Sequence, residues 1–285
     1  MAYSDEYRQQ VALLLRAIPV IAKEKCFALK GGTAINLFVR DLPRLSVDID
    51  LTYLTLLPRE RSLGAIDKAM KRISQRLKKT VQGARITEAV KENTVIKLVV
   101  RSQGVQIKIE VTPVLRGCAY KAGLRGVSPS VEDTFGLAEM QVVSFADLYA
   151  GKIMAALDRQ SPRDLFDVRD LLANEGITDD LREAFIVYLI SHHRPMAEVL
   201  SVRAKDIAHD FENNFQGMTK EPVALEELLE TRTAITEAVV GKMPDKHRKF
   251  LVDFEAGNPD WSLLDIPKAS KGTSEQVCAD MRYCP

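Results

Sequence analysis

Two aspartates one residue apart, inside an apolar run, are the first residues of this chain whose types and spacing could do chemistry. In the segment 47–51 (VDIDL), apolar residues alternate with Asp48 and Asp50. Successive side chains of a β-strand point to opposite faces, so a strand here places both carboxylates on one face. Two like charges on one face repel each other unless a cation lies between them. The pattern indicates a metal site, although a solvated amphipathic strand is the common explanation of an Asp-x-Asp pair taken alone.

A third carboxylate repeats this arrangement further along the chain. The segment 105–111 (VQIKIEV) alternates apolar and polar residues and carries Glu110 on its polar face. If the two strands are neighbours with their apolar faces aligned, Asp48, Asp50 and Glu110 converge on one patch. Carboxylate oxygens are ligands for Mg²⁺, which prefers few carboxylates together with substrate phosphates. These three residues are therefore the candidate metal ligands.

Two glycines, Gly31 and Gly32, follow a short apolar run and precede a segment with helical character. Backbone N–H groups at such a strand-to-helix junction can approach a phosphate closely. Thr33 adds a hydroxyl donor there, and Lys30 adds a positive charge. A plain strand-to-helix turn explains the glycines equally well when they are taken alone. Together with the aspartates of the next strand, they predict a combined phosphate and metal site.

The elements that must position these residues follow from apolar periodicity and turn residues. Strands are expected at residues 26–29, 45–51, 94–101, 105–112 and 141–143, with a hairpin turn at SQG between the third and fourth. Helices are expected at residues 5–24, 33–40, 58–79, 144–158, 162–173, 179–191, 197–212, 222–241 and 244–254. The sequence therefore predicts an α/β (α+β) fold, in which a mixed sheet with flanking helices is followed by a helical bundle.

Composition and charge exclude few classes of function. The 285 residues carry a formal net charge of +1, so any surface for nucleic acid must be local. No stretch approaches the roughly 18 apolar residues of a membrane-spanning helix, and the first residues lack a secretory signal. The cysteines and histidines show no zinc-ligand spacing. A cytoplasmic protein without a membrane partner is expected.

Several of these motifs together resemble one known group of enzymes. KGGTA (residues 30–34) followed by RLSVDIDL (44–51) resembles the signature of the AbiEii/AbiGii-type (MenT-like) nucleotidyltransferase toxins, within the polymerase-β-like nucleotidyltransferase superfamily. The resemblance continues in YAGK (149–152) and RDLFD (163–167), and so covers about residues 25–175. The combination is specific, whereas each piece alone is not.

The resemblance implies a domain organisation and an activity. Residues 1–140 would be a nucleotidyltransferase catalytic domain, residues 141–267 a helical domain completing the active-site cleft, and residues 268–285 a disordered tail. The enzyme would transfer a nucleoside monophosphate from a nucleoside triphosphate (NTP) to an acceptor hydroxyl and release pyrophosphate. Two Mg²⁺ ions would assist the transfer.

The resemblance also implies roles for individual residues. Gly31, Gly32 and Thr33, beside Lys30, would hold the triphosphate. Asp48 and Asp50 would bind Mg²⁺, and Glu110 would be the third carboxylate. The superfamily more often has Gly-Ser where this chain has Gly-Gly-Thr, and often has aspartate where this chain has Glu110. The hydroxyl of Thr33 would then replace that of the serine. The assignment of Glu110 as the third carboxylate depends on strand periodicity more than on a motif.

Four charged residues of the helical half are further candidates. Lys152 would be a catalytic or phosphate-binding lysine, with a snorkelling surface residue as the alternative. Arg163 would contact the nucleotide or be a solvated helix charge. Asp164 has the position of a capping-box acid after Ser161, which explains it without chemistry. Asp167 has no such explanation, and we expect it to be catalytic or to pair with Arg163 or Lys152.

The acceptor and the partners are the least constrained part of the prediction. The resemblance favours the 3′ end of tRNA, or another RNA, and implies a cognate antitoxin. The segment 58–79 carries eight basic residues that could follow an RNA backbone, although charge runs are more often solvated helix faces: Arg59, Arg61, Lys68, Lys71, Arg72, Arg76, Lys78 and Lys79. Transfer to a protein or small molecule, and a catalytically silent interaction module, are the alternatives.

Overall fold

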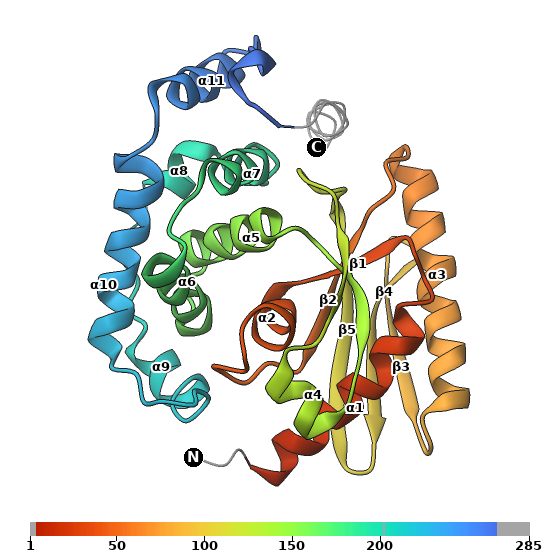
Figure 1. The fold of residues 1–285 in the computed structure, drawn as a ribbon. Coiled ribbons are helices and arrows are strands. Elements are labelled where there is room, and N and C mark those ends of the chain that lie inside the picture. Colours follow the sequence, from red (N-terminus) through yellow and green to blue (C-terminus); the bar gives the residue numbers. More distant parts are fainter. Residues whose placement is uncertain (1–3, 202, 267–285) are drawn as a thin grey trace. The chain divides into compact units, whose positions relative to one another are not determined.

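A seven-stranded mixed sheet organises the first of two units into which the chain divides (Figure 1). The computed structural model describes residues 4–201 and 203–266. The first unit contains the residues up to Gly117 together with Lys121–Val143, and the second contains Cys118–Tyr120 together with the residues from Ser144 onward. The predicted tail at 268–285 lies outside the described residues.

The strands of the sheet unit follow the order β3-β4-β5-β2-β1-β7-β6. Their bounds are β1 Phe27–Lys30, β2 Asp48–Tyr53, β3 Arg85–Lys91, β4 Thr94–Ser102, β5 Val105–Arg116, β6 Gly123–Gly126 and β7 Glu139–Val142. The helical segments of this unit are α1 Asp5–Ile21, α2 Gly31–Thr33, the π-helix η1 Ala34–Val39, α3 Arg59–Thr80 and α4 Pro129–Phe135. The predicted mixed α/β class is confirmed.

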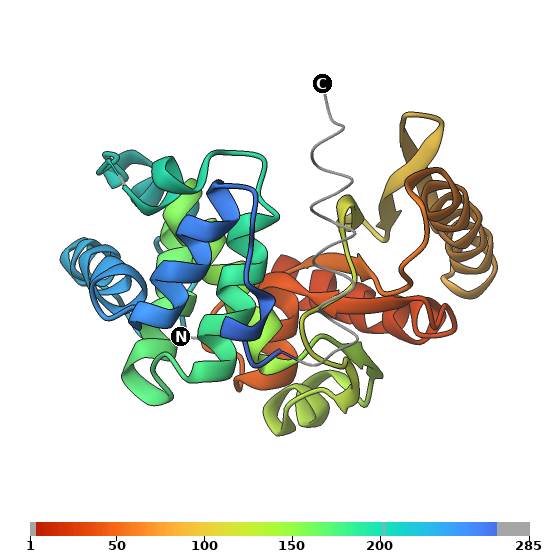
Figure 2. The same ribbon diagram turned by 90° about the horizontal axis from the view of Figure 1, so that it is seen from above.

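The central strands carry the residues of interest. β2 runs parallel to β5 and antiparallel to β1, so the two strands with carboxylates are direct neighbours. Ile49, Leu51 and Ile109 are fully buried, whereas the acidic residues between them are partly exposed on the other face. Helices α1 and α3 lie side by side and pack against β5 and β4 (Figure 2). Burial of one face thus leaves the acidic residues on the opposite one.

The predicted hairpin between β4 and β5 turns through two residues. Gln103 and Gly104 both have left-handed backbone conformations, with φ of 51° and 83°. Positive φ at both central residues belongs to the type I′ turn, whose twist matches that of the flanking strands. Ser102 and Val105 pair directly on either side of the turn. The turn therefore sets the register along the whole hairpin.

The second unit is built mainly from helices in its described part. Its elements are α5 Phe145–Asp158, α6 Pro162–Asn174, α7 Asp179–Ile190, α8 Met196–Leu200, α9 Ala208–Asn214, α10 Leu225–Thr236, the π-helix η2 Glu237–Gly241, α11 Asp245–Glu255 and the 3₁₀-helix η3 Trp261–Leu263. Helix α5 packs against α6, α7, α8 and α10 (Figure 1). Within residues 4–201 and 203–266, no helix is long and apolar enough to cross a membrane.

A buried carboxylate joins the segment Cys118–Tyr120 to this helical unit. Asp147, in the first turn of α5, accepts hydrogen bonds from the backbone N–H groups of Ala119 at 2.6 Å and Tyr120 at 2.9 Å. Burial raises the pKa of the Asp147 carboxyl, and hydrogen bonds from Ser144 and these two N–H groups oppose that effect. The three-residue segment is therefore fixed to α5 by satisfied backbone donors.

Candidate active site

Four charged residues form a row across the central strands. Lys30 of β1 is the register partner of Asp50 of β2, and Asp50 is in turn the partner of Glu110 of β5. Glu110 is the partner of Lys97 of β4. Residues paired across strands share a face of the sheet. The row thus alternates as cation, two acids, cation, and it includes a lysine, Lys97, that the sequence analysis did not single out.

Asp48 occupies the next row on the same face. It lies two residues before Asp50 on β2, and its register partner is Lys108 of β5. The two rows together place three carboxylates on one face, as strand alternation requires. Lys97 is close enough to both rows for its pKa to be affected by both. The hydrogen bond from Lys97 to Glu110 raises the lysine's pKa most, and the charge of Asp48 adds to the effect.

The carboxylates of Asp50 and Glu110 turn toward different neighbours. Nζ of Lys97 lies 2.6 Å from Oε1 of Glu110, in an ion pair whose two side chains are 34% and 41% exposed. The carboxylate of Asp50 instead lies against the Cα of Gly31. Glu110 therefore interacts toward β4, while Asp50 contacts the turn that follows β1.

The acidic residues offer two carboxylates rather than a closed metal cage. Within the part of the chain that the structure describes, no group of three or more histidine, cysteine, aspartate or glutamate side chains is arranged to hold a metal ion. Asp48 and Asp50 are partly exposed oxygen donors on one face. Mg²⁺ usually keeps waters and takes one or two carboxylates plus substrate phosphates. The Asp48 and Asp50 pair fits that chemistry without a third protein ligand.

Gly31 is the residue that lets β1 turn directly into a helix beside Asp50. Its φ of +75° lies in the left-handed region that side chains disfavour. A Cβ at this position would overlap Oδ2 of Asp50. At the next position, a Cβ on Gly32 would come within 3 Å of the ends of the Arg44 and Ser46 side chains. Both glycines therefore serve close packing, and Gly31 also serves backbone conformation.

Thr33 holds the start of β2 from inside the protein. Its side chain is fully buried, and its hydroxyl donates to the carbonyl oxygen of Asp48 at 2.6 Å. The same Oγ1 lies 3.0 Å from Oγ of Ser46. The chain continues from Thr33 into the π-helix η1, a rare conformation that often accompanies functional sites. The threonine hydroxyl is thus engaged with the strand that carries the aspartates.

In the helical unit, Lys152 lies in a buried cluster of charges. Its Nζ is 2.8 Å from Oδ1 of Asp164 and 2.9 Å from Oδ2 of Asp167. Arg159, whose side chain is mostly exposed, reaches the cluster from the surface, with its Nε 2.8 Å from Oδ2 of Asp164. Lys152 is 6% exposed, so it is not a snorkelling surface residue. The expected pairing of Asp167 with Lys152 is present.

Asp164 does not have the capping role that its position indicated. The N-cap Ser161 makes no side-chain capping bond at the start of α6, and the carboxylate of Asp164 turns to Lys152 and Arg159 instead. Burial alone would raise the pKa of Asp164, but the charges of Lys152 and Arg159 and their hydrogen bonds lower it to about 2. Arg163, one residue earlier, is exposed.

The basic helix α3 is less available to a polyanion than its composition indicates. Arg72 and Arg76 both bind Glu24, at 2.6 and 2.7 Å. Lys71 pairs with Asp67 and Arg59 pairs with Glu92. Four of the eight cations are thus offset by acids, and four exposed ones lack such a pair among the described residues: Arg61, Lys68, Lys78 and Lys79.

Comparison with known proteins decides which class of enzyme uses this arrangement. The sequence model of a family described as "Nucleotidyl transferase AbiEii toxin, Type IV TA system" matches residues 12–269. The chain belongs to this family. It is therefore a nucleotidyltransferase and belongs with the AbiEii toxins of type IV toxin–antitoxin systems. Membership of this family implies a cognate antitoxin. Enzymes of this family generally use a nucleoside triphosphate and a divalent metal.

The fold is similar to that of one solved structure. MenT4, a nucleotidyltransferase toxin from Mycobacterium tuberculosis H37Rv, matches with a TM-score of 0.60 and 17% identity, over 97% of this chain and 92% of that chain. A chain of the CdnC:HORMA-deltaN complex of E. coli MS115-1 is 13% identical over 97% of this chain and 91% of its own, but its TM-score of 0.27 supports no argument. No curated protein matches the chain.

Proposed function

We propose that this AbiEii-family enzyme is Mg²⁺-dependent and transfers a nucleoside monophosphate from an NTP to an acceptor hydroxyl at the 3′ end of tRNA. One observation carries the proposal: the carboxylate of Asp50 lies against Gly31, at the junction where β1 becomes a helix. A candidate metal ligand and a candidate phosphate-binding turn therefore touch. Neither feature alone separates a nucleotide site from an amphipathic strand or an ordinary turn.

The residues of the sheet unit divide the work of binding. Asp48 and Asp50 would hold the metal, with up to two Mg²⁺ ions shared with the triphosphate. The backbone at Gly31 and Gly32 would approach the phosphates, and Lys30 would supply positive charge beside Asp50. The contacts of Thr33 favour a positioning role at Asp48 over a direct phosphate contact. Glu110 is proposed as the third carboxylate, available when its bond to Lys97 opens.

The proposed transfer is an in-line displacement at the α-phosphorus. The acceptor hydroxyl oxygen forms a bond to the α-phosphorus. The bond between the α-phosphorus and the oxygen that bridges it to the β-phosphorus breaks. The departing pyrophosphate takes the electron pair, and Glu110 is the proposed acceptor of the hydroxyl proton. Bound Mg²⁺ would supply a lower pKa for the acceptor hydroxyl and would offset charge on the departing pyrophosphate.

Lys152, Asp167 and Arg163 are proposed to serve the same reaction from the helical unit. Lys152 and Asp167 are proposed as catalytic, and Lys152 and Arg163 as nucleotide-binding. The buried bonds of Lys152 to two aspartates support a residue whose position is tightly held. A purely structural role is the alternative, because removing one partner from such a cluster leaves a buried charge uncompensated. An activity measured beside stability separates the two roles.

The first test measures the product directly. Purified protein is incubated with Mg²⁺, total tRNA and each α-labelled NTP in turn, with parallel reactions that omit RNA or Mg²⁺. We expect label on tRNA with one preferred nucleotide, and none after Asp48→Asn. Asp133→Asn is the matched control, because it changes an exposed aspartate on α4 of the same unit.

Each other outcome changes the proposal in a defined way. Transfer retained after Asp48→Asn contradicts the metal assignment. Label on protein alone, or on a small molecule, would mean that this molecule and not RNA is the acceptor. Transfer without Mg²⁺, in the presence of a chelator, contradicts the metal dependence. No transfer to any acceptor and no metal-dependent nucleotide binding would identify a catalytically silent interaction module.

A further inference from the structure

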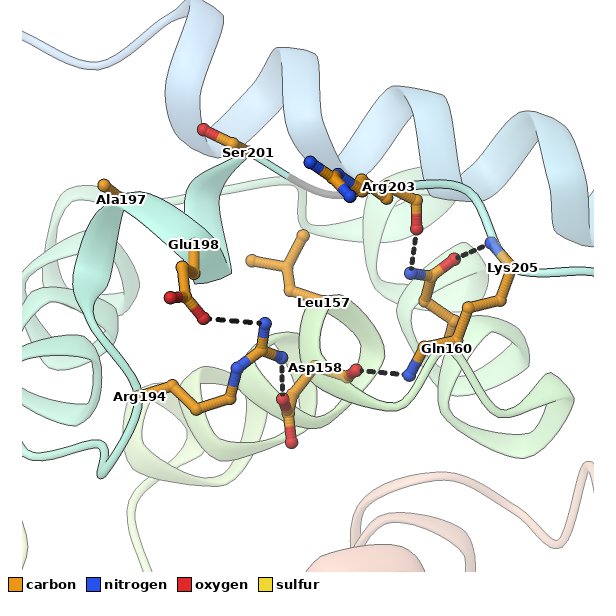
Figure 3. Close-up of a pocket in the computed structure, with 9 residues that line it drawn as sticks. All are labelled: Leu157, Asp158, Gln160, Arg194, Ala197, Glu198, Ser201, Arg203 and Lys205. Carbon is orange, nitrogen blue, oxygen red and sulfur yellow. Dashed lines mark hydrogen bonds and ion pairs between the residues drawn. The ribbon is translucent and has the colours of Figure 1, made fainter.

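A pocket within the helical unit has the chemistry of a phosphate site, and none of the candidate site residues described above lines it. It lies between the end of α5, helix α8 and residues 203–205 (Figure 3). Its volume of about 580 Å³ is within the range of small-ligand pockets, roughly 300–1,000 Å³. Leu157 and Ala197 give it an apolar part. The rest of its lining is mostly charged.

The cations of this pocket are not all matched by acids. Arg194 is paired, since it binds Asp158 and also reaches Glu198 at 3.4 Å. The Nζ of Lys205 donates to a backbone carbonyl, that of Asp158, at 2.9 Å. Within residues 4–201 and 203–266, no hydrogen bond or ion pair engages the guanidinium of Arg203, which is exposed. Two cations are therefore available to an anion entering the pocket.

One buried glutamine builds the wall that presents both of these cations. Gln160 is 2% exposed, and its side chain donates to the carbonyl of Arg203 at 2.8 Å and accepts from the N–H of Lys205 at 3.0 Å. Figure 3 shows these two bonds on one side of the pocket and the Arg194 ion pair with Asp158 on the other. The cation-bearing segment is thus tied to the turn after α5.

The backbone of Gln160 is itself in an unfavourable conformation. Its φ is +55°, in the left-handed region, and this conformation is unfavourable in free energy for a residue that has a side chain. Arg232 of α10 adds a further tie, donating to Oε1 of Gln160 at 3.2 Å and to the carbonyl of Lys205 at 2.8 Å. Strained residues that the surroundings hold firmly occur preferentially at binding sites. The pocket is therefore a built feature of the fold.

We propose that this pocket binds a nucleotide, with its phosphate on Arg203 and Lys205 and its base against Leu157 and Ala197. Arginine and lysine are the usual phosphate partners, and every base has a flat apolar face. The nucleotide can be free or part of a nucleic-acid strand, since both present the same phosphate and base. None of the pocket residues has a part in the proposed transfer reaction, and occupation of the pocket requires no metal.

Binding is measured on the full chain in the presence of a chelator, so that metal-dependent triphosphate binding does not contribute. The probe is a short fluorescent single-stranded oligoribonucleotide, and unlabelled AMP and inorganic phosphate are competitors. The test variant is Arg203→Gln with Lys205→Gln. The matched control is Lys220→Gln with Lys242→Gln, which removes two exposed lysines of the same unit outside the pocket.

We expect the pocket variant to weaken binding by about tenfold or more, because it removes hydrogen bonds to charged groups, while the control variant retains its affinity. Ala197→Trp is a second variant, which fills the pocket from an exposed position on α8 without changing charge, and it should weaken binding as well. AMP should displace the probe at a much lower concentration than inorganic phosphate does. That result supports recognition of base and phosphate together.

The arms of the experiment distinguish the sources of the nucleotide. Displacement of the strand by AMP at similar concentration indicates a mononucleotide site, and much tighter binding of the strand indicates a nucleic-acid site. Equal losses in the pocket and control variants would overturn the proposal in favour of diffuse surface charge. Unchanged binding in all three variants, with each variant folded, would overturn it outright.

Discussion

The Cα of Gly31 faces the carboxylate of Asp50 so closely that a methyl group at position 31 would overlap Oδ2. This contact makes the glycine a determinant of the aspartate's position as well as of the turn. Gly31→Ala should therefore both destabilise the protein and displace Asp50. We expect a loss of at least the roughly 1–2 kcal/mol of left-handed strain, together with loss of nucleotidyl transfer. Chemical denaturation and a transfer assay measure the two effects.

Gly83 provides the matched control for Gly31. Its φ is +67°, close to the +75° of Gly31, but a Cβ there meets nothing within 4 Å. Gly83→Ala should thus cost a similar backbone strain and leave transfer intact. If both variants lost stability equally and both retained transfer, the contact between Gly31 and Asp50 would have no functional meaning.

Thr33 allows a second prediction, because its hydroxyl has two competing explanations. If it holds Asp48, Thr33→Val leaves the carbonyl of Asp48 without this donor and should cost about 0.5–1.5 kcal/mol of stability, with a lower kcat. Thr33→Ser keeps the hydroxyl, so its losses of stability and of kcat should be much smaller. A direct phosphate contact would instead raise the KM for the NTP in the valine variant and leave stability unchanged.

The cluster around Lys152 predicts a dependence of stability on pH. The pKa of Asp164 falls from 3.8 to about 2 on folding, so between these pH values the unfolded chain binds more protons than the folded one. The stabilisation is complete above pH 4 or so and is lost as the pH falls through about 2. The lowered pKa corresponds to roughly 2 kcal/mol. Urea titrations at several pH values measure it.

Asp164→Asn tests the origin of that pH dependence. The variant should be less stable than the wild type by about 2 kcal/mol at neutral pH, and this difference should shrink as the pH is lowered toward 2. The exposed Asp133→Asn should leave the curve unchanged. A difference between wild type and Asp164→Asn that did not vary with pH would mean that the lost contacts, and not the charge, stabilise the unit.

The part of the site that lies on strands could be predicted from the sequence, because alternation alone assigns residues to faces. Asp48, Asp50 and Glu110 share a face for that reason, and the two-residue turn at Gln103 and Gly104 sets the hairpin register that pairs Glu110 with Lys97. Counting back from that turn would have found Lys97.

Other features depend on tertiary context that a single sequence does not display. Strand β3 was not predicted, because nearly all of Arg85–Lys91 is exposed and an edge strand of this kind lacks the alternation of a half-buried one. The burial of Lys152 depends on partners from the following helix. Thr33 looked like a phosphate ligand because its hydroxyl follows two glycines, whereas the fold turns that hydroxyl toward Asp48.

Lys97 leads to the last prediction, which concerns metal affinity and rests on the proposed function. In the ion pair with Glu110, the ammonium occupies the place that a cation would need to reach that carboxylate. Lys97→Met should therefore bind Mn²⁺, a spectroscopic substitute for Mg²⁺, severalfold more tightly than the wild type does. Removing any nearby positive charge also favours a cation, so Glu110 has to be tested separately.

Two further variants isolate the contribution of Glu110. Lys91→Met removes an exposed lysine from the neighbouring strand β3 and should leave Mn²⁺ affinity nearly unchanged. Adding Glu110→Gln to Lys97→Met should cancel the gain if the freed carboxylate binds the metal, and the double-mutant cycle measures that coupling. If the gain persisted in the double variant, Lys97 would act on Asp48 and Asp50 through its charge alone, and Glu110 would not be a metal ligand.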